Sequence, residues 1–347
     1  MSILIAILIF GALVLFHEWG HFLAARRMGV VVTEFSLGMG PRILSAQKGE
    51  TRYSWRLLPI GGSCMMLGEF GDEEVPGSFQ SKSVWKRIFI IVMGPLFNFL
   101  LALILSMILI GMAGYDSPVI LETIEGMPAE EAGIEAGDVI TSIGGRRIYL
   151  YAEISDFVTF HQDVLEKGPV KITWKHDGEK KSADITAALS DDGRYVLGIR
   201  GSSSYRTRGG PLQIIGYGAA QVRYWIRLVF ESLGMLFNGQ AKVSDLSGPV
   251  GIVSVINDTY QQTRADGLFY VIINLLNLTI LLSANLGVVN LFPIPALDGG
   301  RIVLLLVEAV CGKRMSPERE GMIQFVGFAL LMALMVIVMF NDIGRLF

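Results

Sequence analysis

Four long apolar stretches divide the chain, and each is long enough to cross a lipid bilayer. They cover residues 3–25, 88–113, 268–292 and 322–340. A helix needs about 20 predominantly apolar residues to span the hydrocarbon core. The pattern therefore predicts four transmembrane helices, with a long and more polar insert between the second and the third.

A cleaved signal peptide is the alternative for the first stretch. Such a peptide carries its basic residues before the apolar run and a small-residue cleavage site after it. Here the basic pair, Arg26 and Arg27, follows the apolar run instead. We therefore expect the first stretch to remain as a membrane span.

Composition agrees with a membrane protein. Of the 347 residues, 52% are hydrophobic and 18% are charged, and the mean hydropathy is +0.50. Soluble domains carry about 25% charged residues, so an ordinary cytosolic enzyme is disfavoured. The net charge of −3 gives no sign of nucleic-acid binding. The two cysteines, Cys64 and Cys311, are far apart and can form neither a disulfide framework nor a thiolate zinc site.

Lysine and arginine concentrate in two of the segments that join the spans. Residues 26–87 hold nine of them, and the stretch after the third span holds four more. Cytoplasmic loops of membrane proteins carry such an excess. We therefore expect both segments in the cytosol, and the N-terminus, the insert at about 114–267 and the C-terminus on the outer side.

Two segments of the first cytosolic loop, residues 34–41 and 53–67, are β-prone and interrupted by glycine. One interpretation is a pair of hairpins at the membrane surface. In the other interpretation, the strands dip into the membrane and offer an edge to an extended peptide. Non-helical backbone is tolerated at that depth only where protein or water covers it. The sequence leaves both open.

The first apolar stretch contains the motif His17-Glu18-x-x-His21. Residues four apart share one face of a helix, so the two imidazoles can bind one zinc ion, with the glutamate placed as general base. Three ionisable groups inside a span are costly and indicate function. At 1.5 Å per residue, His17 lies roughly 13 Å along the helix from Arg26, inside the bilayer and toward its cytosolic side.

A catalytic zinc takes three protein ligands and keeps one position open. The other histidines, His161 and His176, lie in the insert, on the wrong side of the membrane. Asp298 is the only acid between residues 267 and 307, and it follows two prolines that end the third span. Its alternative role is a helix cap, but a carboxylate at this depth is what the site lacks.

These motifs together resemble the site-2 protease family of intramembrane zinc metalloproteases. The closer similarity is to the bacterial branch that cleaves anti-sigma factors and carries an inserted PDZ domain, of which this insert has room for one. The motifs that carry the resemblance are His17-Glu18-x-x-His21, residues 35–41, Gly94-Pro95-Leu96-Phe97-Asn98, residues 247–252 and Asn290-x-x-Pro293-x-Pro295-x-Leu297-Asp298-Gly299. Many relatives have histidine where this chain has Arg301, which affects no expected ligand.

The resemblance implies a zinc endopeptidase that hydrolyses peptide bonds within the transmembrane segments of single-span proteins, such as anti-sigma factors or remnant signal peptides. It implies Zn²⁺ held by His17, His21 and Asp298, with Glu18 as the catalytic base. It also implies a multi-pass protein of a bacterial inner or plasma membrane, whose PDZ domain lies outside.

The resemblance further implies that Asn98 and Asn290 lie near the substrate helix. Each has an alternative role, because an asparagine in a span often only ties two helices together. We expect further substrate contacts from the β-prone segment and from the broken helix end, at Gly61, Gly62, Pro293 and Pro295.

The insert resembles a PDZ domain, with strands expected at 118–124, 170–174, 182–186 and 194–199 and with a short helix, a glycine turn and another strand over 127–140. Leu197, Gly198 and Ile199 resemble the loop and strand of a groove that captures a peptide C-terminus by strand addition. The alternative is a steric gate that binds no ligand. An amphipathic helix is expected over 211–237.

The predicted fold class is an α-helical polytopic membrane protein with membrane-associated β-hairpins and an inserted α+β PDZ domain. The expected parts are a first membrane part (1–115), the PDZ domain (116–202), a connecting segment with the amphipathic helix (203–267) and a second membrane part (268–347). Two other classes, a transporter with a buried zinc site and a PDZ adaptor with an inactive site, are disfavoured. No inverted repeat is apparent, and Glu18 is intact.

Overall fold

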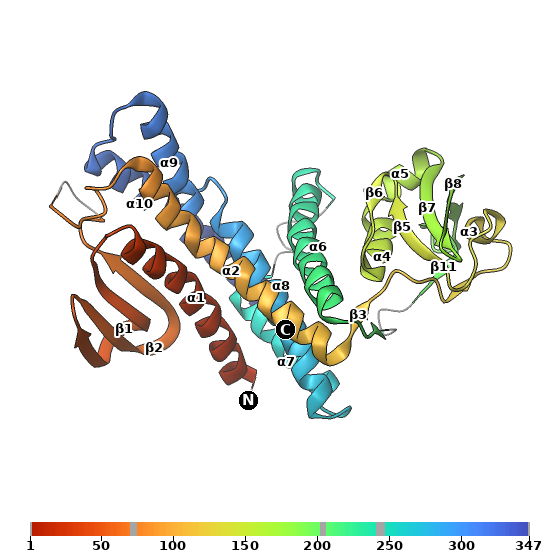
Figure 1. Cartoon of the computed structure of the whole chain (residues 1–347), viewed down its shortest axis with the longest axis horizontal. Coiled ribbons are helices and arrows are strands. Elements are labelled where there is room, and N and C mark those ends of the chain that lie inside the picture. The colour runs from red at the N-terminus through yellow and green to blue at the C-terminus, as the bar shows by residue number, and fades with distance from the viewer. Residues whose placement is uncertain (1, 70–74, 202–205, 241–246, 346–347) are drawn as a thin grey trace. The chain divides into compact units, whose positions relative to one another are not determined.

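The computed structural model of the chain describes residues 2–69, 75–201, 206–240 and 247–345 (Figure 1). It divides into two units: Met1–Leu105 with Trp225–Phe347, called here the membrane unit, and Ser106–Tyr224, called the inserted unit. Residue 202 of the expected PDZ domain and residues 203–205 and 241–246 of the expected connecting segment lie outside the described residues. The domain bounds expected from the sequence stay predictions.

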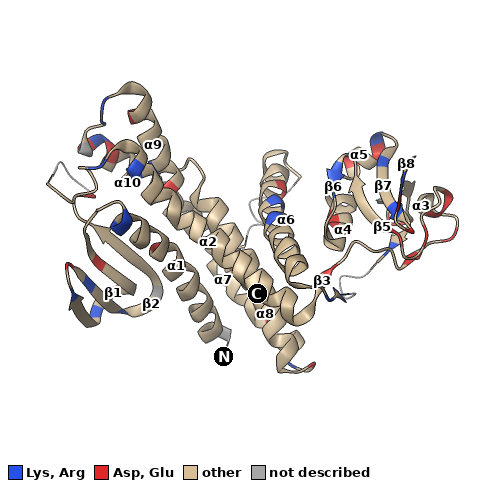
Figure 2. Ribbon diagram, viewed as in Figure 1, with Lys and Arg blue, Asp and Glu red and all other residues tan. Residues whose placement is uncertain are grey.

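Within the described residues, four helices are long and apolar enough to cross a membrane. They are α1 (Ser2–Arg27), α2 (Val84–Ala113), α8 (Leu268–Asn290) and α10 (Pro317–Gly344). Charged residues are sparse along these helices and gather in the loops, in the hairpin and in the inserted unit (Figure 2). The predicted class of a polytopic helical membrane protein with β-hairpins and an inserted α+β domain is confirmed.

Two glycines bring α1 and α2 into close contact. A Cβ atom added to Gly20 of α1 would lie 2.2 Å from the carbonyl oxygen of Met93 on α2. A Cβ atom added to Gly94 of α2 would lie 2.3 Å from Nε2 of His21 on α1. Small residues let two helix backbones approach in this way. The backbone of α2 therefore borders the histidine motif directly.

The two β-prone segments form one long antiparallel hairpin of β1 (Val32–Lys48) and β2 (Thr51–Met66). The hairpin folds back on itself, because residues 34–37 lie between residues 62–65 and residues 52–55. Phe35, for example, pairs with Cys64 on one side and with Tyr53 on the other. In the described residues, the segment 62–66 has a strand on one side only, and it is therefore an edge of this folded sheet.

An ion-pair cluster around a buried glutamate cross-links the hairpin. Glu34 is 4% exposed and accepts hydrogen bonds from Nη2 of Arg42 at 2.5 Å and from Nη2 of Arg56 at 2.8 Å. Burial alone would raise the pKa of Glu34, but the hydrogen bonds from the two guanidinium groups outweigh burial and lower it to about 2. The cluster joins β1 to β2 where the sheet folds over.

A second buried carboxylate secures the C-terminal span. Asp342 of α10 is 3% exposed and accepts hydrogen bonds from the backbone N–H groups of Gly248 at 3.1 Å and Gly251 at 2.8 Å. These glycines flank the start of α7 (Pro249–Thr263), where backbone N–H groups lack partners within the helix. The motif at residues 247–252 thus holds α7 against α10.

The inserted unit is built on a four-stranded sheet in the order β6–β5–β7–β8, with antiparallel neighbours. Its strands are β5 (Val139–Ile143), β6 (Arg146–Arg147), β7 (Val170–His176) and β8 (Glu179–Ile185). Short strands complete the unit at β3 (Tyr115–Asp116), β4 (Glu122–Thr123), β9 (Ala188–Leu189), β10 (Tyr195–Val196), β11 (Ile199–Arg200) and β12 (Arg206–Thr207). Its helices are α3 (Pro128–Glu131), α4 (Tyr151–Phe160) and α5 (Gln162–Lys167).

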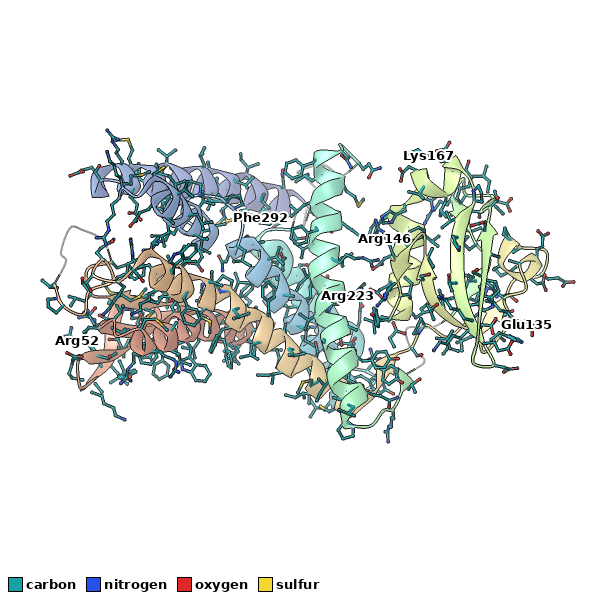
Figure 3. The ribbon with its side chains drawn as sticks, turned by 45° about the horizontal axis from the view of Figure 1, so that its top comes forward. Arg52, Glu135, Arg146, Lys167, Arg223 and Phe292 are labelled. Carbon is teal, nitrogen blue, oxygen red and sulfur yellow. The ribbon has the colours of Figure 1, made fainter. Side chains whose placement is uncertain are left out.

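Helix α6 (Pro211–Phe237) coincides with the predicted amphipathic helix, and its first half belongs to the inserted unit. Arg223 projects from α6 toward α4 (Figure 3) and pairs with Glu153, which is fully buried. The same guanidinium lies 4.5 Å from the ring centroid of Tyr149. A buried charge is tolerated here because both partners are hydrogen-bonded.

Replacing Glu34 by glutamine should destabilise the hairpin by about 1–3 kcal/mol, because the buried side chain loses its charge-assisted hydrogen bonds from Arg42 and Arg56. The pKa of Glu34 is lowered on folding, so its contribution is complete above its ordinary value near 4.5 and is lost as the pH falls toward about 2. Amide hydrogen exchange at residues 35–37, followed against pH, measures this. The Glu50→Gln variant, altered at an exposed turn acid, is the control, and equal exchange in both variants would contradict the role of Glu34.

Candidate metal centre

Three potential metal ligands meet at one point in the membrane unit. Nε2 of His17 lies 3.1 Å and Nε2 of His21 lies 3.4 Å from Oδ2 of Asp298, and the two Nε2 atoms are 3.2 Å apart. Within the described residues, this is the one group of three or more histidine, cysteine or acidic side chains close enough to hold a metal ion. The side chains come from α1 and from the start of α9 (Asp298–Cys311).

These separations fit a zinc ion. Zinc binds nitrogen and oxygen ligands at about 2.0–2.1 Å, so two ligands of a tetrahedral ion are about 3.3 Å apart. Oδ2 of Asp298 is buried without a hydrogen-bond partner. A carboxylate oxygen and two imidazole nitrogens gathered without protons between them repel each other unless a cation lies at their centre.

The outer nitrogens of both rings are held so that Nε2 faces the centre. Nδ1 of His21 lies 3.0 Å from the carbonyl oxygen of Ile90. A carbonyl only accepts hydrogen bonds, so Nδ1 carries the proton and Nε2 keeps its lone pair. Such a second partner fixes the tautomer of a metal-binding histidine.

Asn98 does the same for His17. Its amide group lies 3.1 Å from Nδ1 of His17, and its Oδ1 atom is buried without a partner. The oxygen and nitrogen of an amide are assigned from the hydrogen-bond network. A half-turn of the amide lets Oδ1 accept the proton of Nδ1, which satisfies the orphaned oxygen and frees Nε2. Ser283 of α8 fixes this part of α2 by donating to the backbone oxygen of Asn98 at 2.7 Å.

Helix α9, which begins with Asp298, is anchored at two points. Arg301, one turn after Asp298, donates to Oε1 of Glu69 at 2.6 Å. Further along, Glu308 pairs with Arg87, which is 2% exposed at the start of α2. These ion pairs fix α9 against the end of β2 and against α2, and they hold the aspartate next to the histidines.

A cavity of about 350 Å³ opens onto this centre. Its walls include the three grouped side chains, Glu18, Asn290, Arg301 and residues 63–66 of the sheet edge. Glu18 accepts a hydrogen bond from the backbone of Cys64, and a Cβ atom on Gly62 would lie 3.4 Å from its Cγ atom. Burial raises the pKa of the Cys64 thiol, which keeps this thiol protonated.

The other predicted site residues have different surroundings. Asn98 is fully buried against His17 and is absent from the cavity walls. Gly61 borders Met39 rather than the cavity. Pro295 lies under α10, where a Cβ atom on Gly327 would come within 2.4 Å of it, and Pro293 is exposed. No local pattern in the sequence indicates Glu69, because it pairs with Arg301, which lies 232 positions further along the chain.

The residues of the expected peptide groove lie just before β11 and at its start. Leu197 is buried. Two residues before Leu197, the side chain of Gln162 holds the backbone of Tyr195. Its Oε1 atom accepts from the N–H of Tyr195 at 2.7 Å, and its Nε2 atom donates to the carbonyl oxygen of Tyr195 at 3.0 Å. At the other end, the ring of Tyr151 lies where a Cβ atom on Gly201 would be, at 2.0 Å.

Comparison with known proteins supplies the family. The model of peptidase family M50 matches residues 5–334. The chain belongs to peptidase family M50. The regulator of sigma-W protease RasP of Bacillus subtilis is 33% identical, over 100% of this chain and 99% of that protein. The zinc metalloprotease RasP of Bacillus licheniformis has the same identity and coverage. A protein of Clostridium acetobutylicum is 37% identical over 99% of this chain and 97% of its own length.

This M50 protein is a zinc metalloprotease, as the sequence predicts, and its cofactor is Zn²⁺. Among solved structures, the PDZ domain of the SdrC-like protein of Listeria monocytogenes is 29% identical. It matches 24% of this chain and 86% of that chain, with a TM-score of 0.22.

Replacing Gly94 by alanine should displace the imidazole of His21, because the new methyl group would overlap Nε2. We expect zinc affinity to fall on the order of tenfold or more, as when a group that orients a metal ligand is lost. Gly111→Ala is the matched control, because nothing lies within 4 Å of its added Cβ on the same helix. Zinc titration and thermal unfolding of both proteins measure the effect, and unchanged zinc affinity in G94A would contradict this placement.

Proposed function

We propose that this M50 protease hydrolyses peptide bonds within the membrane-spanning segments of single-span proteins, as a step of regulated intramembrane proteolysis. One observation carries the proposal: Glu18 and two of the grouped metal ligands belong to α1, which is itself long and apolar enough to cross the membrane. Catalytic groups at this depth suit a substrate that also lies in the membrane. The name of the Bacillus subtilis relative supports anti-sigma factors as the substrate class, and remnant signal peptides are a second class.

We assign the zinc ligands to His17, His21 and Asp298 and the general base to Glu18. Zinc, when bound, supplies a Lewis acid that polarises the scissile carbonyl and acidifies a water molecule. Glu18 takes a proton from the attacking water and later gives it to the leaving amine nitrogen. The backbone hydrogen bond from Cys64 holds this carboxylate at the cavity wall during both transfers.

The sheet edge at residues 62–66 is the surface on which we place the substrate backbone. A transmembrane helix hides its carbonyl groups in its own hydrogen bonds, so the segment to be cut has to unwind. An extended peptide can then pair with an exposed strand edge. The edge borders both the cavity and Glu18. We therefore expect Gly61 and Gly62 to lie beside a bound substrate strand.

We assign different roles to the asparagines and prolines that the sequence places near the substrate. Asn290 lines the cavity and is assigned to substrate contact. The contacts of Asn98 support a role in orienting His17 rather than in binding substrate. Pro293 and Pro295 follow the end of α8, and Ala296 and Leu297 directly after them line the cavity, so a substrate contact at the two prolines remains part of the proposal.

We propose that the metal centre lies toward the cytosol and that the inserted unit lies outside, in a bacterial inner or plasma membrane. The excess of lysine and arginine in residues 26–87 and after the third span supports this orientation. At Leu197, Gly198 and Ile199, capture of a peptide C-terminus and steric gating are both retained. The ring of Tyr151 packs against Gly201, two residues after Ile199, and a bulky side chain beside the expected groove residues favours gating.

Replacing Glu18 by glutamine should lower cleavage of a single-span reporter by on the order of 10²–10⁴-fold, the usual contribution of a general base. Zinc content should remain that of the unchanged protein, because the three ligands are intact. The Glu50→Gln variant is the matched control. Mass spectrometry of the products should place the cut within the apolar segment of the reporter. Full turnover by E18Q would refute the base assignment, and a cut outside the apolar segment would refute the intramembrane function.

A further inference from the structure

The sheet of the inserted unit has a hollow surface whose residues are not among those proposed above for catalysis or substrate binding. A hollow of about 480 Å³ lies over β5, β6, β7 and β8. In β7, Ile172 and Trp174 point into the buried core, whereas Thr173 and Lys175, which alternate with them, line the hollow. The hollow is therefore on the face of the sheet opposite the core.

Three cations from neighbouring strands line this hollow without compensation. They are Arg147 of β6, Lys175 of β7 and Lys180 of β8, and no aspartate or glutamate is among the lining residues. In the described part of the chain, none of the three side chains has an ion-pair partner. A concave surface lined by charges of one sign concentrates ions of the opposite sign.

The pairing of the strands makes this charge costly to the empty protein. Lys175 and Lys180 are direct cross-strand neighbours, and like charges placed opposite each other destabilise a sheet. Four residues earlier on the same face of β7, Lys171 lies opposite Asp184, an ordinary complementary pair. The excess of positive charge is thus local to the hollow.

The chemistry of the hollow suits a phosphate group better than a carboxylate. A phosphate carries about −1.5 to −2 charges and offers three acceptor oxygens, and a guanidinium matches it with two parallel hydrogen bonds. The hydroxyl groups of Ser142 and Thr173 also line the hollow and have no hydrogen-bond partner among the described residues. A carboxylate would bring a single charge to three cations.

We propose that this hollow binds a phosphate-bearing ligand between Arg147, Lys175 and Lys180. Free phosphate and the phosphate of an anionic lipid headgroup share this chemistry. Binding relieves the repulsion between Lys175 and Lys180, so the ligand stabilises the inserted unit independently of proteolysis.

Thermal unfolding of the full chain in a neutral detergent tests the proposal, with sodium phosphate titrated against sodium chloride at constant ionic strength. Phosphate should raise the Tm of the unchanged protein. The double variant Lys175→Gln with Lys180→Gln should bind phosphate at least tenfold more weakly, yet have a higher Tm without ligand. The control Lys171→Gln removes one positive charge from the same face of β7, outside the hollow. It should keep the phosphate response and have a lower Tm, because Asp184 loses the opposite charge across from it on β7.

Short-chain lipids and an acidic peptide distinguish the sources of the ligand. Dihexanoyl-phosphatidylglycerol is compared with zwitterionic dihexanoyl-phosphatidylcholine and with tetraglutamate. A response to inorganic phosphate that depends on Lys175 and Lys180 supports a free phosphate, and such a response to phosphatidylglycerol alone supports a lipid headgroup. A response to tetraglutamate alone, no response to any probe, or an unchanged response in the double variant would overturn the proposal.

Discussion

Two imidazole nitrogens and a carboxylate oxygen lie within 3.4 Å of one another among apolar helices. The local packing of α1, α2 and α9 holds these three atoms in place. Polar groups in such surroundings are costly unless each is satisfied. Here Ile90 and Asn98 hold the outer nitrogens, and the inner atoms face a common centre. The absence of a side chain at Gly94 then becomes a requirement, since any Cβ atom would occupy the space of the rings.

The same constraint explains how α9 is held. Asp298 is distant in sequence from the histidines, so its position depends on tertiary contacts. Two ion pairs with low exposure provide these contacts: Arg301 with Glu69, and Glu308 with Arg87. Because Glu69 also accepts a hydrogen bond from the backbone of Met66 at 3.2 Å, it links the helix of the aspartate to the sheet edge. Metal centre and proposed substrate surface are therefore parts of one connected framework.

Much of this could be predicted from the sequence, because the informative signals are local. Hydropathy alone locates the four spans, and the spacing of His17 and His21 places both on one helix face. The isolated acid at Asp298 is informative since acids are rare at that depth. Long-range pairing is different: no local pattern shows that Phe35 pairs with both Cys64 and Tyr53, or that the buried Glu34 pairs with Arg42 and Arg56. For Asn98 the sequence leaves substrate contact and helix packing open, and only the contact with His17 indicates a role in orienting that imidazole.

We expect this centre to hold zinc through two imidazoles and one carboxylate. X-ray absorption spectroscopy of the zinc-loaded protein tests it most directly, because nitrogen and oxygen ligands lie at about 2.0–2.1 Å and sulfur at about 2.3 Å. We expect a shell of nitrogen and oxygen only, with the outer scattering of two imidazole rings, and the loss of one light ligand in the Asp298→Ala protein. A sulfur shell from Cys64, or a spectrum of D298A identical to that of the unchanged protein, would contradict the account.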